Sequence, residues 1–192
     1  MSQTSHKIAD HLGGGERRCH DDKGALEWAA AHLGIKSMLD IGCGQGCVSL
    51  SAVNMGMEVL AVDGDPGDLH GEWNFIRDEK IPFLLHDYTE GSVNPDREFD
   101  LCWSVEFLEH IEAKYIPNFM NDFQKCKYVF VTAAKPGDGG KHHVNEQLPE
   151  YWIDVFLQYG FVYNEQLTSD LKENSSMKKR FFNRNGLVFV KK

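Results

Sequence analysis

A glycine-rich loop with an acidic residue just before it is the feature of this sequence with the clearest chemical meaning. Asp40 precedes the loop Gly42-Cys43-Gly44-Gln45-Gly46, which follows a short apolar run. Glycines in a turn between a strand and a helix allow positive φ angles and let a ligand approach the backbone closely. The spacing G-x-G-x-G differs from the G-x-G-x-x-G of dinucleotide-binding enzymes. The loop therefore predicts a binding turn, with a purely structural turn as the alternative.

The carboxylate of Asp40 bears on the charge of the ligand. It would repel a pyrophosphate, whereas it would attract a cationic amino-acid group, directly or through water. S-adenosylmethionine (SAM) carries an ammonium and a sulfonium and has no phosphate. We therefore expect SAM at this loop rather than NAD.

Two further acidic residues end apolar runs later in the chain. Asp63, followed by Gly64, stands 21 positions after Gly42, where a carboxylate can accept both ribose hydroxyls. Asp87 could accept the adenine amino group, while its neighbour Tyr88 covers the ring. The alternative for Asp63 is a turn or helix-capping role, because Asp63-Gly64-Asp65-Pro66 is also good turn chemistry, and the alternative for Asp87 is a plain turn residue.

Alternating strand and helix patterns would position these residues. Between the first five apolar runs lie segments with helical periodicity, which predicts crossover connections and a mostly parallel sheet. The last two runs are separated by a polar stretch, residues 168–185, without a clear helical face, so we expect a hairpin-like, partly antiparallel pair at one edge. The sequence thus predicts a single α/β domain over residues 1–192 with a doubly wound, seven-stranded sheet. The predicted strands are Ser37–Ile41, Glu58–Val62, Pro82–Leu85, Asp100–Ser104, Tyr128–Thr132, Val162–Leu167 and Leu187–Val190.

These features resemble class I SAM-dependent methyltransferases over about residues 25–161. The resemblance implies the strand order 3-2-1-4-5-7-6. It assigns the loop Asp40–Gly46 to the methionine part of SAM, Asp63 to the ribose and Asp87 to the adenine. It also places Ser104 and Val105, at the exit of the fourth strand, beside the methyl-donor pocket.

Glu106, Glu109 and His110 have the spacing i, i+3, i+4 and would share one face if a helix begins at or before Glu106. A later glycine-rich loop carries His142 and His143. The pattern Glu-x-x-Glu-His with a distal histidine is similar to the metal site of small-RNA 3′-terminal 2′-O-methyltransferases, and its first part resembles ubiquinone-pathway O-methyltransferases.

Three interpretations of these residues stay open. In the first, Glu106, Glu109, His110 and His143 bind a divalent cation such as Mg²⁺ that activates an acceptor hydroxyl. In the second, His142 or His143 is a general base and no metal is bound. In the third, they are loop or capping residues. Glu106, His110 and His143 are the foremost candidates for the chemistry.

Composition limits the partners. With 192 residues and a net charge of −9, the chain is not expected to bind nucleic acid, and Met177–Arg180 is its one candidate basic patch. No apolar run approaches the length of a membrane span, no signal peptide is apparent, and the five cysteines lack zinc-type spacing, so a cytoplasmic protein is expected. Residues 1–20 are expected to form a lid or a flexible terminus, and residues 170–185 a second candidate lid.

The expected function is therefore SAM-dependent O-methylation of a small-molecule or sugar hydroxyl. One alternative is an NAD-linked oxidoreductase on a similar sheet. Another is a non-catalytic SAM-binding partner protein. The sequence does not distinguish a monomer from a homodimer.

Overall fold

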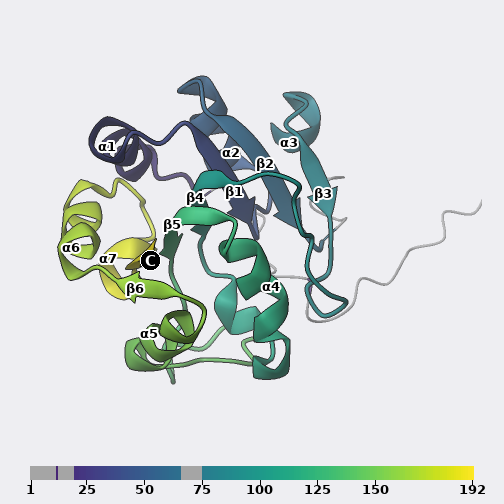
Figure 1. Ribbon diagram of the computed structural model, residues 1–192, viewed down its shortest axis with the longest axis vertical. Coiled ribbons are helices and arrows are strands. Elements are labelled where there is room, and N and C mark those ends of the chain that lie inside the picture. The colour runs from purple at the N-terminus through teal and green to yellow at the C-terminus, as the bar shows by residue number, and fades with distance from the viewer. Residues whose placement is uncertain (1–11, 13–19, 66–74) are drawn as a thin grey trace, which may run out of the picture.

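The computed structural model describes residues 12, 20–65 and 75–192, which form one seven-stranded sheet with helices packed against it (Figure 1). The strand order is β3-β2-β1-β4-β5-β7-β6. All neighbouring strands are parallel except β7, which is antiparallel to both β5 and β6. The predicted fold and strand order are therefore confirmed. The strands are β1 (Ser37–Ile41), β2 (Glu58–Asp63), β3 (Phe83–Leu85), β4 (Phe99–Ser104), β5 (Cys126–Val131), β6 (Phe161–Tyr163) and β7 (Leu187–Lys191).

Two apolar clusters, one on each face of the sheet, hold the helices in place. Helices α4 (Ile116–Phe123) and α5 (Pro149–Gln158) pack over one face through Phe119, Phe123, Trp152 and Phe156. Helices α1 (Lys23–Leu33), α2 (Cys47–Asn54) and α6 (Glu165–Asn174) belong to the cluster on the other face. Burying each large apolar side chain contributes about 1.5–3 kcal/mol, so both layers fix the position of the sheet.

The register brings the carboxyl ends of the parallel strands together at one edge. Ile41 pairs with Val62, Asp63 with Leu85, and Ser104 with Val131. In an open α/β sheet, ligands bind beyond this edge. The acidic strand ends and the segment after β4 therefore lie on the side of the molecule where a site is expected.

Two predictions about the elements are wrong. The polar stretch 168–185 is largely helical: α6 reaches Asn174, and α7 covers Phe181–Asn185. The predicted strand Val162–Leu167 ends at Tyr163, because the Asn164 side chain accepts a hydrogen bond from the Leu167 amide and begins α6. The β6–β7 pair is antiparallel as expected, but two helices connect it instead of a hairpin turn.

The helical segment expected between the fourth and fifth strands is also divided. Short 3₁₀ helices, η2 (Leu108–His110) and η3 (Ala113–Tyr115), come before α4. Between the second and third strands, where a helical segment was expected, α3 covers Phe75–Asp78, and residues 66–74 lie outside the described residues. Most of the expected N-terminal lid lies outside them too. Among the residues that the structure describes, no helix has the length and apolar character needed to cross a membrane.

Candidate active site

The glycine loop makes a tight turn between β1 and α2 that a larger residue would disturb. Gly42, Gly44 and Gly46 have φ angles of +75°, +52° and +81°. The amides of Gly42 and Cys43 both donate to the Val62 carbonyl of β2, at 2.9 and 3.2 Å. A Cβ at Gly42 would lie 3.0 Å from the Phe107 ring, and one at Gly46 would lie 2.5 Å from the Ile76 side chain. The glycines are thus required by backbone conformation and by close packing.

Asp40 lies buried beneath this loop. The Ser49 hydroxyl of α2 donates to its Oδ2 at 2.6 Å, and its side chain is 2% exposed. Burial raises the pKa of Asp40 to about 7, opposed by the bond from Ser49 and assisted by the negative charge of Asp63. A nearby cation would favour the charged carboxylate. The site therefore suits a ligand with a positive group.

Asp63 joins the end of β2 to the glycine loop. Its Oδ2 accepts a hydrogen bond from the Gly44 amide at 2.8 Å, and its Oδ1 accepts one from the Asp65 amide at 2.9 Å. Burial raises the pKa of Asp63, while these amides oppose the rise. A carboxylate has about four acceptor positions, so two amides leave capacity for hydroxyl donors. Half-buried Gly64 follows it, and a Cβ there would lie 3.2 Å from the His86 carbonyl.

At the end of β3, Asp87 and Tyr88 have different environments. Asp87 is half-buried and its Oδ1 accepts a hydrogen bond from the Thr89 amide at 2.8 Å, as in a turn. Tyr88 is buried, and its hydroxyl donates to Asp122 Oδ2 at 2.9 Å. Its ring packs against Phe107. The Tyr88 side chain thus belongs to the core, and its carbonyl accepts a hydrogen bond from the Asn118 side-chain amide at 2.6 Å.

The remaining predicted donor-site residues surround the same strand ends. Cys43, Gln45 and Val105 are half-buried, and the Gln45 carbonyl accepts a hydrogen bond from the Phe75 amide at 3.1 Å. Ser104 is fully buried, and its hydroxyl has no hydrogen-bond partner among the described residues. A buried hydroxyl without a partner is unfavourable, so Ser104 marks a place where a further polar group would be stabilising.

Glu106 is not helical, and the prediction that it shares a helix face with Glu109 and His110 is wrong. Its φ angle is +54°, a conformation that non-glycine residues adopt rarely and at a cost of about 1–3 kcal/mol. The Thr132 hydroxyl at the end of β5 accepts from the Glu106 amide at 2.9 Å and donates to Glu106 Oε1 at 2.8 Å. These two bonds hold the turn and direct the carboxyl toward β5.

Glu109, His110 and His143 nevertheless come together. One potential ligand atom from each lies within 4.8 Å of the others. The amides of Val144 and Asn145 both donate to the Glu109 carbonyl, at 2.9 and 3.0 Å, and attach the histidine loop to η2. Tertiary contacts between two loops therefore form this cluster. Glu106 and His142 are not part of it, although the charge of Glu106 acts on Glu109.

The cluster contains buried polar atoms that lack partners. Neither carboxyl oxygen of Glu109, nor Nδ1 of His110, has a hydrogen-bond partner among the described residues. Burial, together with the negative charge of Glu106, raises the pKa of Glu109 to about 8. Burial and the nearby His143 lower the pKa of His110 to about 4. A neutral imidazole beside a carboxyl group is a donor set suited to a divalent cation.

His143 is oriented by a residue that sequence reasoning missed. Its Nδ1 lies 2.9 Å from Glu146 Oε1, which leaves Nε2 for a ligand. Glu146 Oε2 and Oε1 also accept from the Gly137 and Gly139 amides, both at 2.9 Å. The spacing of Glu146, three positions after His143, is the sequence feature that could have indicated this pair. Thr132 had no comparable signal, because its relation to Glu106 depends on the β4–β5 register.

Comparison with known proteins agrees with this geometry. Residues 39–126 match the family described as a methyltransferase domain. Over 82 residues, 40% of this chain, the sequence is 35% identical to the mitochondrial ubiquinone biosynthesis O-methyltransferase of Schizosaccharomyces pombe. The chain spans about a third of the length of the curated relatives it matches, 29% of this one and 32% of the ubiquinone biosynthesis O-methyltransferase of Rickettsia akari.

Solved structures share the fold over most of the chain. A TehB-like SAM-dependent methyltransferase from Corynebacterium glutamicum has a TM-score of 0.63 and 19% identity, covering 88% of this chain and 87% of that one. The cyclase SpnF has a TM-score of 0.63 and 14% identity, covering 95% and 91%. At these identities the likeness concerns the fold alone. The resemblance to class I SAM-dependent methyltransferases is thus confirmed for the matched domain and for the fold.

Proposed function

We propose that this chain, which carries the methyltransferase domain and the class I fold, transfers a methyl group from SAM to a hydroxyl oxygen of a small molecule. The observation that carries the proposal is the position of the Glu109, His110 and His143 cluster. It lies after β4, at the same sheet edge as the glycine loop. The proposed donor site and the proposed oxygen-activating residues would therefore be neighbours.

The donor site fits SAM through the charge and hydrogen-bonding capacity of its residues. Buried Asp40 would favour the ammonium group, and Asp63 retains acceptor capacity for ribose hydroxyls. Asp87 is positioned at the next strand end for the adenine. NAD is disfavoured, because its pyrophosphate would lie against these carboxyl groups. An NAD-linked oxidoreductase is therefore the less favoured alternative function.

The acceptor side supports oxygen as the nucleophile. The acceptor oxygen would form a bond to the methyl carbon while the carbon–sulfur bond of SAM breaks, and the hydroxyl proton would leave. His143 is positioned to take that proton at Nε2, because Glu146 engages its Nδ1. The products are a methyl ether, S-adenosylhomocysteine and a proton.

The unpartnered atoms of Glu109 and His110 also fit a divalent cation, with His143 as a third ligand and Glu106 next to them. When bound, such an ion lowers the pKa of a coordinated hydroxyl. The relatives in S. pombe and R. akari are named for O-methylation in ubiquinone biosynthesis. Their names support a small-molecule acceptor and methyl transfer to an oxygen atom. A sugar hydroxyl remains a second possibility within the same class.

The test uses purified protein, SAM labelled on the methyl group and a panel of catechols and sugars, with and without Mg²⁺. We expect methyl transfer to at least one hydroxyl compound, and Mg²⁺-dependent transfer to be lost in Glu109→Gln. Glu112→Gln is the matched control, since exposed Glu112 lies in the same segment outside the cluster. Methylation of protein or nucleic acid alone would contradict the proposal. SAM binding without turnover in cell extracts would favour a non-catalytic partner protein.

The monomeric or dimeric state, the single-domain assignment and the cytoplasmic location remain predictions. Cys102 and Cys126 are free thiols, whereas Cys47 is disulfide-bonded, so cysteine chemistry does not decide the compartment.

A further inference from the structure

The segment between α6 and β7 has a charge opposite to that of the whole protein. Residues 175–186 contain Lys178, Lys179, Arg180 and Arg184 and no aspartate or glutamate, although the chain has a net charge of −9. All four side chains are exposed. A segment that has several cations and no acidic residue attracts anions locally, even on a protein with a negative net charge.

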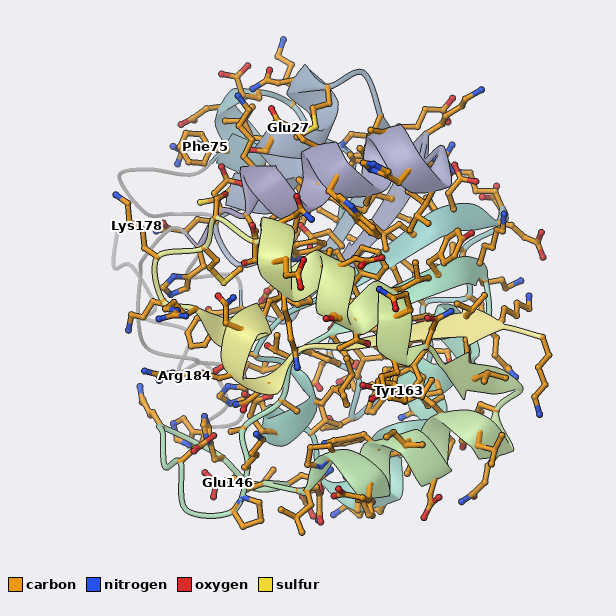
Figure 2. The ribbon with its side chains drawn as sticks, turned by 90° about the vertical axis from the view of Figure 1, so that its left-hand side faces the viewer. Glu27, Phe75, Glu146, Tyr163, Lys178 and Arg184 are labelled. Atoms are coloured by element: carbon orange, nitrogen blue, oxygen red, sulfur yellow. The ribbon has the colours of Figure 1, made fainter. Side chains whose placement is uncertain are left out.

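This segment lies against the loop that carries His143. The Lys135 Nζ donates to the Arg184 carbonyl at 3.2 Å, and the Asn185 side-chain amide donates to Asp138 Oδ2 at 3.1 Å. Lys178 and Arg184 lie along the same side of the molecule as Glu146, the residue that orients His143 (Figure 2). The cations therefore border the proposed acceptor site.

The loop that carries His143 and the cationic segment both contribute charges to the surface beside the proposed acceptor site. Residues 135–146 and 175–186 together carry six lysines and arginines and two carboxylates, Asp138 and Glu146. Both carboxylates are already engaged: Asp138 accepts from the Lys135 amide and Asn185, and Glu146 from two glycine amides and His143. The positive charge of Lys179 also acts on Glu106. Within these two segments, lysines and arginines therefore outnumber carboxylates by six to two.

The cationic segment is anchored by hydrogen bonds at its start and by two buried side chains. Buried Asp22 accepts hydrogen bonds from the Ser175 hydroxyl at 2.5 Å and from the Ser176 amide at 2.7 Å. Met177 and Phe182 are buried in the core, so the cations between them project from anchored backbone. Arg180 has a φ of +55°, a rarely populated conformation that the surrounding contacts must maintain. An anchored backbone has less conformational entropy to lose on binding than a mobile loop would have.

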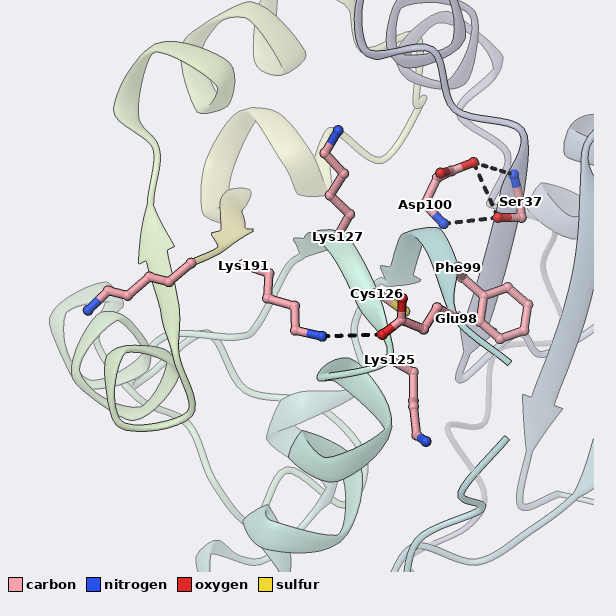
Figure 3. A pocket seen from close by; sticks show the side chains of 9 residues that line it. Ser37, Glu98, Phe99, Asp100, Lys125, Cys126, Lys127 and Lys191 are labelled. Atoms are coloured by element: carbon pink, nitrogen blue, oxygen red, sulfur yellow. Dashed lines mark hydrogen bonds and ion pairs between the residues drawn. The ribbon is translucent and has the colours of Figure 1, made fainter. Parts of the chain in front are cut away.

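The lysines at the other end of the sheet are arranged differently. A shallow pocket beside the amino ends of β4 and β5 is lined by Lys125, Lys127 and Lys191, but also by Glu98 and Asp100 (Figure 3). Lys191 contacts Glu98 at 3.8 Å, and Asp100 accepts from Ser37. Two carboxylates thus lie among the lysines of this pocket, whereas segment 175–186 itself contains none. It supplies a matched control.

We propose that the cationic segment 175–186 binds an anionic group, a phosphate or a carboxylate, on the acceptor molecule. The segment selects acceptors that carry a negative charge near the hydroxyl to be methylated. Arginine forms paired hydrogen bonds with either group, and lysine adds charge. This inference rests on the proposed function, because it assigns a substrate class to the same site.

The test titrates inorganic pyrophosphate or malonate, as phosphate and carboxylate probes, into the S-adenosylhomocysteine-saturated protein at low salt. The variant K178Q/K179Q/R180Q/R184Q is compared with K36Q/K125Q/K127Q/K192Q, which changes the net charge equally at the opposite end of the sheet. We expect the first variant to bind a probe at least about tenfold more weakly than wild type, and the control to change by less than about threefold. A preference for pyrophosphate assigns a phosphate and a preference for malonate a carboxylate.

Paired acceptors give a second readout. Catechol is compared with 3,4-dihydroxybenzoate, and adenosine with its 5′-monophosphate. The variant K178Q/K179Q/R180Q/R184Q should have a higher KM for the anionic acceptor of each pair and an unchanged kcat. Equal weakening in both variants would overturn the inference, as would an oligonucleotide that binds far more tightly than either probe. Failure of S-adenosylhomocysteine to bind would overturn the proposed function instead, and the variant comparison on the ligand-free protein would still decide the anion site.

Discussion

Asparagine at position 40 should remove a pH dependence from both folding and donor binding. Asp40 is buried, Ser49 donates to it at 2.6 Å, and its pKa is raised to about 7. Asparagine has nearly the same shape and can accept the same hydrogen bond. The substitution therefore removes the titration with little change in packing.

The size of the effect follows from the pKa. A rise from 3.8 to about 7 corresponds to about 4 kcal/mol between the two protonation states. Because the folded protein holds this proton more tightly than the unfolded chain, the contribution of Asp40 is fully present below pH 3.8 and declines as pH rises to about 7. The free energy of unfolding of wild type, relative to Asp40→Asn, should thus fall by about 3–4 kcal/mol between pH 4 and pH 8.

Donor affinity should change in the opposite direction. Above pH 7 the carboxylate is charged and attracts the ammonium of S-adenosylhomocysteine, so wild-type affinity should rise between pH 6 and pH 8. A charge-assisted hydrogen bond contributes about 1.5–3 kcal/mol, which predicts roughly 10- to 100-fold weaker binding in Asp40→Asn at pH 8. At pH 6 the difference should be smaller.

Urea denaturation and calorimetric titration at pH 4–8 would measure both effects. Asp100→Asn is the control, because Asp100 accepts hydrogen bonds from Lys36 and Ser37 at the opposite end of the sheet. That variant should leave donor affinity unchanged. Parallel stability curves for wild type and Asp40→Asn across this range would refute our assignment of a buried, proton-binding Asp40.

Three further substitutions test other parts of the structure. Gly42→Ala combines a φ of +75° with a Cβ 3.0 Å from Phe107, so urea denaturation should show a loss of about 1–3 kcal/mol, and donor binding should weaken; unchanged stability would contradict the loop geometry. Asp22→Ala removes the acceptor for Ser175 and for the Ser176 and Ala25 amides, so thermal denaturation should reveal a loss of about 1–3 kcal/mol, with Asp21→Ala as comparison. In Gly140→Ala the new Cβ would lie 2.2 Å from His143 Nε2, so metal-dependent methyl transfer should fall while donor affinity is retained; full activity would remove His143 from the acceptor site.

The fold was predictable because local patterns agree with the overall topology. Each parallel strand is a short apolar run, and the acidic residues Asp40 and Asp63 lie at or near the ends of adjacent strands. The region after β5 was harder. Segment 165–185 lacks a strong apolar face, and its helices depend on Asn164 as a cap and on a few buried residues such as Leu171 and Phe182.

The site was predictable in its residue types but not in its geometry. The i, i+3, i+4 spacing suggested a helix face, whereas the positive φ of Glu106 and the 3₁₀ turn place Glu109 and His110 by another route. The bonds from Val144 and Asn145 to the Glu109 carbonyl bring His143 to them. Such contacts between distant segments depend on the sheet register and leave no local pattern. Tyr88 shows the same limit, because its partner Asp122 is 34 residues away.

The most direct test of the central claim is calorimetric titration of the protein with S-adenosylhomocysteine, with NADH as the competing ligand and Asp63→Ala as the variant. Our account predicts one micromolar site in wild type, loss of that site in Asp63→Ala, and no binding of NADH. The absence of S-adenosylhomocysteine binding, or binding of NADH to the same site, would contradict the assignment of the glycine loop to SAM.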